Sequence, residues 1–144
     1  MIEVCGNIWD YHDQGWIVIP TSLATRRDGK AVMGAGLSLQ AAERFPLLPK
    51  MLGDYLRLGG HDCSYYPGYR LFCLPTKNDW RDLASLDMIR DGCNTLVSQA
   101  RNITKVFLPA LGCGCGGLDW ADVRPVMEQV LQDSKFVVVL EDGA

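Results

Sequence analysis

Short apolar runs that alternate with segments of helical periodicity constrain the fold of this chain most strongly. The run Trp16-Ile17-Val18-Ile19 is typical of a strand buried on both faces of a sheet. Runs of this kind predict strands at 2–6, 15–20, 69–74, 105–108 and 136–140. Helical spacing of apolar residues predicts helices from about residue 35 to 45 and at 47–58, 86–100 and 120–131. Because each parallel crossover uses a helix, we expect an α/β fold with a largely parallel sheet and helices on both faces.

Local signals set the expected ends of these elements. Pro75 is expected to close the strand at 69–74, with a polar loop following from Thr76 to Asp82. Pro46 stops the first helix, and Asp119 is placed to cap the last one. The segment 63–69 is aromatic and turn-rich. The clearest helix is expected to bury one apolar face, formed by Leu86, Ile89, Cys93, Leu96, Val97 and Ala100.

The composition favours a single soluble domain. The chain has 144 residues, of which 48% are hydrophobic and 22% charged, close to the globular average. We expect one domain over residues 1–144, a monomer without a membrane segment. The first ten residues, MIEVCGNIWD, lack the pattern of a secretory signal, so we expect a cytoplasmic protein.

Cysteines and charges narrow the chemistry further. We expect the six cysteines to be free thiols, because a chain of this size and apolar content needs no disulfides. We expect no metal, because the two histidines, His12 and His61, have no ligand spacing. A net charge of −3 argues against a broad basic face for nucleic acid. The local cluster of Arg26, Arg27 and Lys30 is either a solvated loop or a small basic contact surface.

The segment Val32-Met33-Gly34-Ala35-Gly36-Leu37 places two glycines at the start of an expected helix. Free backbone N–H groups and the positive end of the helix dipole converge at such a position, which suits a phosphate. Glycines before a helix are also common as ordinary turn residues, so this segment alone leaves both interpretations open.

A second loop, Gly112-Cys113-Gly114-Cys115-Gly116-Gly117, lies between a strand and a capped helix. Small residues of this kind let consecutive backbone amides approach an anion. Two such loops in one α/β domain indicate a diphosphate ligand held from both sides. The thiols of Cys113 and Cys115 can be metal ligands or nucleophiles, but the interpretation we favour is that they fill a tight loop.

The third segment, Pro75-Thr76-Lys77-Asn78-Asp79-Trp80-Arg81, follows a strand at the edge where ligands of parallel sheets bind. Lys77 is the residue of chemical interest there. A lysine at such a position is either a solvated surface charge or, when partly desolvated, a nucleophile toward a sugar or carbonyl carbon. Spacing alone does not decide between these roles.

Taken together, Gly6-Asn7-Ile8, the segment 32–36, Leu74-Pro75-Thr76-Lys77 and Leu111-Gly112-Cys113-Gly114 resemble the macrodomain family. More narrowly, the chain resembles the terminal ADP-ribose glycohydrolase branch that includes the DarG-type antitoxin macrodomains. The runs 77–81 and 116–120 are the most specific parts of the resemblance, which covers nearly the whole chain. It implies a three-layer α/β/α macrodomain with a central mixed, largely parallel sheet.

The resemblance also implies roles for individual residues. The segment 6–8 would meet adenine, the loop 33–37 would hold the diphosphate and distal ribose, and the loop 112–118 would close over both. Ser22 matches a position near the distal ribose, and Lys77 matches a catalytic lysine that attacks its anomeric carbon. The implied ligand-binding residues are Asn7, Ile8, Thr21, Ser22, Met33, Gly34, Ala35, Gly36, Leu37, Gly112, Cys113, Gly114, Cys115, Gly116, Gly117 and Leu118.

Three features depart from the family pattern. Many macrodomains have an aspartate where this chain has Asn7, whose carbonyl can also accept a hydrogen bond from adenine. Better-known eukaryotic relatives have an acidic residue at the position of Gly116, which the DarG-type proteins also lack. The loop 23–31 is longer than usual and adds the basic cluster near the distal side.

These observations lead to a functional hypothesis. We expect a hydrolase that removes ADP-ribose from a DNA base such as thymidine, or from an acidic side chain, without a cofactor or metal. Its partner would be an ADP-ribosylated substrate, including ADP-ribosylated DNA. The alternatives are a non-catalytic ADP-ribose reader, an ADP-ribose 1″-phosphate phosphatase and a nucleotide-binding domain with another ligand.

Overall fold

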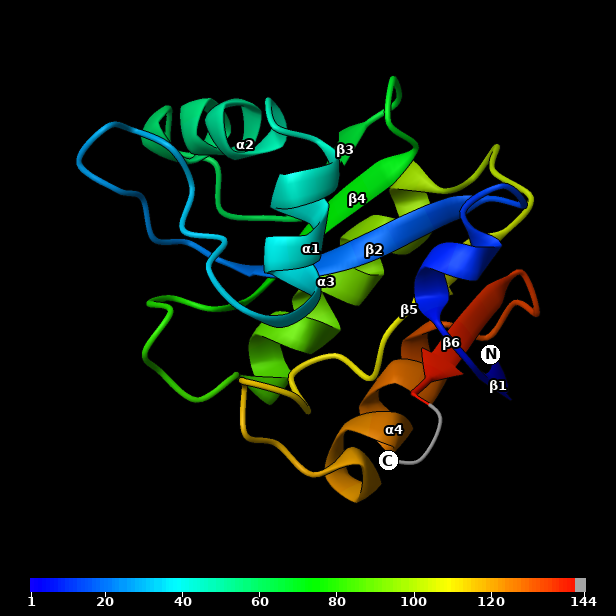
Figure 1. The fold of residues 1–144 in the computed structure, drawn as a ribbon. Helices are drawn as coiled ribbons and strands as arrows, with labels where there is room; N and C mark the ends of the chain where they lie inside the picture. The colour runs from blue at the N-terminus through cyan, green and yellow to red at the C-terminus, as the bar shows by residue number, and fades with distance from the viewer. Residues whose placement is uncertain (142–144) are drawn as a thin grey trace.

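The computed structural model describes residues 1–141. Figure 1 shows helices and strands that alternate along the chain. The strands are β1 (Ile2–Cys5), β2 (Trp16–Ser22), β3 (Ser64–Tyr66), β4 (Leu71–Lys77), β5 (Val106–Leu108) and β6 (Phe136–Leu140). The α-helices are α1 (Gly36–Arg44), α2 (Leu48–Arg57), α3 (Leu86–Gln99) and α4 (Trp120–Val130), and a 3-10 helix, η1, covers Ile8–Tyr11.

The strands form one six-stranded sheet in the order β1-β6-β5-β2-β4-β3. All neighbouring pairs are parallel except β3 and β4, which are antiparallel. The mixed, largely parallel sheet that the sequence predicts is therefore confirmed. Its antiparallel member is the short strand at the outer end beside β4.

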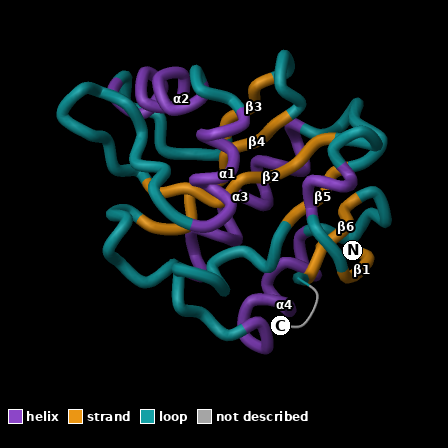
Figure 2. Tube along the Cα trace, viewed as in Figure 1, coloured by secondary structure: helices purple, strands orange, loops and turns teal. Residues whose placement is uncertain are grey.

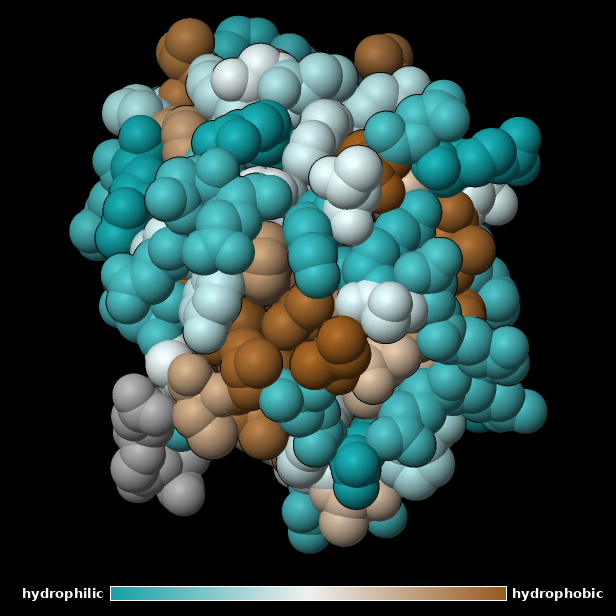
Figure 3. Space-filling model, turned by 90° about the vertical axis from the view of Figure 1, so that its right-hand side faces the viewer, coloured by the Kyte–Doolittle hydropathy of each residue, from teal (hydrophilic) through white to brown (hydrophobic). Residues whose placement is uncertain are grey.

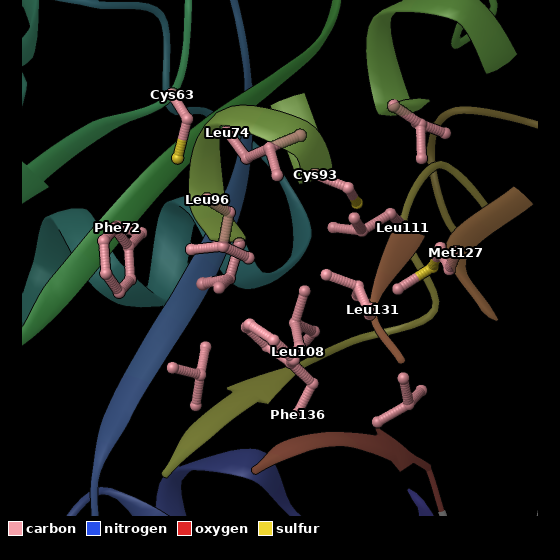
Figure 4. Close-up of a cluster of buried hydrophobic side chains, with 14 of the residues drawn as sticks. Cys63, Phe72, Leu74, Cys93, Leu96, Leu108, Leu111, Met127, Leu131 and Phe136 are labelled. Carbon is pink, nitrogen blue, oxygen red and sulfur yellow. The ribbon is translucent and has the colours of Figure 1, made fainter. Parts of the chain in front are cut away.

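Helices cover both faces of the sheet. Successive strand residues point to opposite faces, so the strands contribute side chains to two buried clusters. Ile17, Ile19 and Leu71 pack in one buried cluster with residues of η1, α1 and α2. Val18 and Phe72 belong to the other cluster, which includes residues of α3 and α4. Figure 4 shows side chains of this second cluster, among them Phe72, Leu74, Leu96, Leu108 and Met127. The structure therefore has the three α/β/α layers that the family resemblance implies.

Both prolines near the strand ends lie inside strands, which corrects the expected boundaries. β2 continues through Pro20 to Ser22, and β4 continues through Pro75 to Lys77. Proline lacks the N–H that a ladder needs, and it is tolerated where one side of a strand has no partner. β5 pairs with β2 only as far as Ile17, and β3 pairs with β4 only as far as Cys73. Each proline therefore lies beyond the reach of one neighbouring strand.

Other local predictions had mixed outcomes. Asp119 caps α4 as expected, with its side chain accepting a hydrogen bond from the N–H of Ala121. The aromatic segment 63–69 contains β3, and η1 was not predicted. Val97, expected in the buried face of α3, is 37% exposed, so that part of the prediction is wrong.

Each of the two outer strands exposes a large hydrophobic side chain. Figure 3 shows the side of the molecule where β1 and the N-terminus lie, with apolar side chains gathered near the middle of that face. Ile2 of β1 is 43% exposed, and Tyr65 of β3 is 55% exposed.

Within residues 1–141, no helix combines the length and apolar character needed to cross a bilayer.

Candidate functional site

The sheet topology brings three loops to one edge. The parallel strands β2, β4 and β5 end at Ser22, Lys77 and Leu108, so the segments that follow them leave the sheet on the same side. Figure 2 shows these loops in teal on one side of the molecule. From β2 the chain continues toward β4, whereas from β5 it continues toward β6, in the opposite direction. The crevice outside such a switch point is where ligands of α/β sheets bind.

The N-terminus of α1 is left open at this edge. Its N-cap residue, Ala35, makes no side-chain capping bond. By contrast, the side chain of Ser85 caps α3 and that of Asp119 caps α4. The first-turn N–H groups of α1 therefore lack the side-chain acceptor that these two helices have, which suits an anionic ligand.

The two glycine loops face each other across the crevice. A methyl group added to Gly36 would lie 4.0 Å from Sγ of Cys115 in the second loop. A methyl group added to Gly34 or to Gly114 would meet nothing within 4 Å. The structure thus brings together the two loops that the sequence assigns to a diphosphate, and each contributes a glycine that faces open space.

The second loop is also fastened to the body of the protein. The N–H of Ala84 donates to the carbonyl of Gly116 at 2.9 Å, and the N–H of Leu118 donates to the carbonyl of Gly112 at 2.9 Å. Gly112 adopts φ +75° and lies against Ala84 and Ile89. The loop after β4 and the loop after β5 are therefore packed as one unit.

Lys77 is the last residue of β4 and lies opposite Ser22 of β2 in the sheet register. Its side chain is half-buried, and Nζ donates to the carbonyls of Trp80 and Asp82 at 3.3 and 3.4 Å. The catalytic lysine implied by the resemblance therefore lies beside the residue implied to be near the distal ribose. In this conformation its ammonium group closes the loop that follows β4.

The charged residues of that loop are paired with each other. The guanidinium of Arg81 donates to both carboxylate oxygens of Asp79, at 3.0 and 3.2 Å. These hydrogen bonds lower the pKa of Asp79 to about 2. Asp82 accepts a hydrogen bond from the backbone N–H of Asp79. Within the described residues, Lys77 is thus held by neutral carbonyls and by no carboxylate.

Several of the implied ligand-binding side chains have structural roles. The side chain of Asn7 caps η1 by accepting a hydrogen bond from the N–H of Trp9 at 3.0 Å. Met33 is 6% exposed and packs in the core, and Thr21 and Ser22 are also buried. At Met33 the side chain supports the fold, so a ligand would meet backbone there.

One cavity at this edge was missed by the sequence reasoning. It has a volume of about 630 Å³ and lies between the outer edge of β4, the segment before β3 and α3. Its polar lining residues include Asp62, Asn78, Ser85, Asp91, Asn94 and Thr95. A smaller cavity of about 260 Å³ lies at the opposite end of the sheet, where β2 begins at Trp16. Within residues 1–141, no group of three or more potential metal ligands is found.

Comparison with known proteins agrees with this architecture. No protein-family model matches the chain. The DNA ADP-ribosyl glycohydrolase of Thermus aquaticus is 33% identical over 120 residues, which cover 75% of this chain and 33% of that protein. The macrodomain of Mycobacterium tuberculosis DarG matches with a TM-score of 0.82 at 25% identity, covering 99% of this chain and 97% of that structure. Thermosipho africanus DarTG in complex with ADP-ribose matches with a TM-score of 0.72 at 22% identity, covering 89% and 38%.

The three-layer fold, the strand order and the two facing loops define a macrodomain. Within that family, this chain belongs to the DarG-type macrodomains, as the sequence resemblance predicts. The chain spans about a third or less of the length of the curated relatives it matches.

Proposed function

We propose that this chain binds ADP-ribose in the crevice between its two glycine loops and hydrolyses the bond between the distal ribose and a modified DNA base. One observation carries the catalytic part of the proposal. Lys77 lies opposite Ser22, at the end of the crevice where β2 and β4 meet. A primary amine at that position is the kind of group that can attack an anomeric carbon.

The similar proteins support the choice of ligand and target. The name of the Thermus aquaticus relative describes a glycohydrolase that acts on ADP-ribosylated DNA, and the Thermosipho africanus structure contains ADP-ribose. In this chain, the open N-terminus of α1 and the glycines facing the crevice suit a diphosphate. Binding energy from the adenosine and diphosphate can then orient the distal ribose against Lys77.

The proposed reaction has two steps. Nζ of Lys77, as the neutral amine, leaves the carbonyls of Trp80 and Asp82 and forms a bond to the anomeric carbon. The glycosidic bond breaks, and the base leaves with its electron pair and takes up the proton that Nζ loses. Water then displaces the lysine and releases ADP-ribose. Because Nζ is held by neutral acceptors, its movement into the crevice breaks no ion pair.

The first test replaces the amine. We expect Lys77→Ala to lower kcat for release of ADP-ribose from an ADP-ribosylated thymidine oligonucleotide by about 10³-fold. ADP-ribose affinity, measured by calorimetry, should stay within about threefold, because the loops that hold the diphosphate are unchanged.

Lys77→Arg is the matched variant. Arginine can still donate hydrogen bonds to the carbonyls of Trp80 and Asp82, but it does not lose its proton in proteins and cannot act as the nucleophile. We expect this variant to be as inactive as Lys77→Ala. Recovery of turnover by arginine would show that Lys77 acts by closing its loop, and nucleophilic attack would then be excluded.

A non-catalytic ADP-ribose reader is the second candidate, and one observation favours it. Both hydrogen bonds of Nζ point into its own loop, as they would if Lys77 only held that loop in place. A reader would bind ADP-ribose and the modified oligonucleotide without turnover. Single-turnover measurements with excess protein distinguish the two, because a hydrolase releases ADP-ribose under these conditions.

A further inference from the structure

We propose that the cavity beside β4 receives the group from which ADP-ribose is removed, and that its lining selects an uncharged heterocyclic base. This inference rests on the proposed function, because it assigns a place to the leaving group of that reaction. The cavity lies between the outer edge of β4, the segment before β3 and α3, and its volume of about 630 Å³ is in the range of small-molecule sites.

The strand order places the cavity in line with the proposed ligand. Along the order β1-β6-β5-β2-β4-β3, the implied adenine position follows β1, and the diphosphate loops meet between β5 and β2. Ser22 and Lys77 come next, where β2 and β4 end. A ligand extended in this direction would present its leaving group beyond β4. The cavity lies there.

Two lining residues of the cavity also adjoin the proposed ribose position along the chain. Leu23 and Asn78 line it, and they directly follow Ser22 and Lys77. The N–H of Leu23 donates to the carbonyls of Lys77 and Asn78, at 3.1 and 3.2 Å. These bonds join the ends of β2 and β4, so the lining of the cavity begins directly beside the proposed ribose position.

The lining favours some leaving groups over others by charge. Among residues 1–141 it contains the carboxylates of Asp62 and Asp91, a single imidazole, that of His61, and no lysine or arginine, so acidic groups predominate. A phosphate or a carboxylate would be repelled there, because like charges at short range raise the energy of both. The remaining polar lining includes Asn78, Ser85 and Asn94, whose amides and hydroxyl can pair with the N–H and C=O groups of a base.

One wall of the cavity is preorganised. Asp62 accepts hydrogen bonds from Oγ1 of Thr95 and from the N–H of Cys63, both at 2.7 Å. Its own N–H donates to the hydroxyl of Tyr55 at 3.1 Å. The segment before β3 is therefore tied to both α2 and α3, so a base would meet a wall that needs little reordering on binding.

The experiment fills the cavity from an exposed position. Asn94→Trp places a large side chain at the lining, whereas Ser98→Trp places the same side chain one helical turn along α3, at an exposed position outside the lining. Both variants are made in the Lys77→Ala background, so that substrates persist during binding measurements. The melting temperature of each protein checks that the fold is retained.

Three probes are compared by calorimetry: ADP-ribose, a thymidine nucleoside carrying ADP-ribose on its base, and a glutamate peptide carrying ADP-ribose. The nucleoside has no phosphodiester backbone, so a difference between it and ADP-ribose reports the base with its deoxyribose and no phosphate contact. We expect the nucleoside to bind about tenfold more tightly than ADP-ribose, a difference of about 1.4 kcal/mol. The peptide should show no such advantage.

Asn94→Trp should remove the advantage of the nucleoside and leave ADP-ribose affinity unchanged, whereas Ser98→Trp should change neither. The inference is overturned if the nucleoside and ADP-ribose bind equally, or if Asn94→Trp leaves the difference intact. Turnover with Lys77 present is measured separately. A protein that shows the base preference but no turnover would retain the cavity assignment and refute the hydrolase, so the two proposals fail by different observations.

Discussion

The two glycine loops look alike in sequence but use their glycines differently. In the loop before α1, a methyl group added to Gly34 would meet nothing within 4 Å. In the loop after β5, a methyl group added to Gly116 would lie 2.5 Å from the carbonyl oxygen of Gly112. The first glycine keeps space open in front of a helix terminus, whereas the second lets two backbone segments touch.

Gly114 shows that the distinction belongs to positions and not to whole loops. It lies two residues before Gly116, yet a methyl group added there would also meet nothing within 4 Å. Gly34 and Gly114 thus form a pair, one from each loop, that faces open space. Gly112 and Gly116 fasten the second loop to the segment that contains Ala84. Within the loop 112–117, substitution of Gly114 should therefore affect ligand binding, whereas substitution of Gly116 should affect stability.

The largest effect is expected from Gly116→Ala. Its added methyl group would overlap backbone atoms of Gly112, which cannot turn aside as a side chain can. We expect the free energy of unfolding to fall by about 3 kcal/mol, as for other overpacked sites. For a domain of this size, Tm would fall by on the order of 10 °C. Thermal unfolding followed by circular dichroism measures the change.

Gly114→Ala is the control for that loss. The same substitution two residues earlier meets open space, so Tm should stay within about 2 °C of the wild-type value. Equal destabilisation by both substitutions would mean that the loop tolerates no side chain at any position, and the distinction between the two glycines would be lost.

A smaller effect, on affinity alone, is expected from Gly34→Ala and Gly114→Ala. Both positions face open space, where we expect an added methyl group to meet the bound diphosphate and to weaken ADP-ribose binding about tenfold, or by about 1.4 kcal/mol. Gly68→Ala is the matched control, because that glycine also faces open space but lies in the turn between β3 and β4. Calorimetry that finds all three variants equal to wild type would refute a diphosphate site between the loops.

The sequence predicted the elements well because their signals are local. The apolar run of β2, the spacing in α3 and the cap at Asp119 each depend on residues within one segment, and the structure confirms them. β3 was missed because three residues in an aromatic, turn-rich segment carry too short a pattern. The ends of β2 and β4 were placed too early, at Pro20 and just before Pro75, because the sequence does not show where each neighbouring strand stops pairing.

The candidate site was predictable only in part. Its loops and Lys77 are recognisable from short motifs, but the pairing of Ser22 with Lys77 depends on sheet register. The bonds from Nζ to the carbonyls of Trp80 and Asp82 depend on the conformation of the loop. The cavity was not predictable, because the segments that line it lie far apart in the sequence and carry no shared pattern.

The smallest expected effect is on the alkylation rates of the two thiols in the second loop. It tests whether the ligand binds between the two glycine loops. Cys115 is exposed and lies near Gly36, whereas Cys113 is half-buried. Burial and, to a smaller extent, the carboxylate of Asp119 raise the pKa of Cys113 above its ordinary value. Because the thiolate is the reactive form, iodoacetamide should modify Cys113 slowly at pH 7 and faster as the pH rises.

Saturating ADP-ribose should slow alkylation of Cys115 by about fivefold, because the bound form predominates at saturation and its ligand leaves the thiol only partly accessible. Adenosine, which has no diphosphate, should give no protection. Peptide mass spectrometry resolves the two cysteines within one experiment. If adenosine protects as well as ADP-ribose, Cys115 lies beside the nucleoside and not the diphosphate, and the facing loops would have to be reassigned along the crevice.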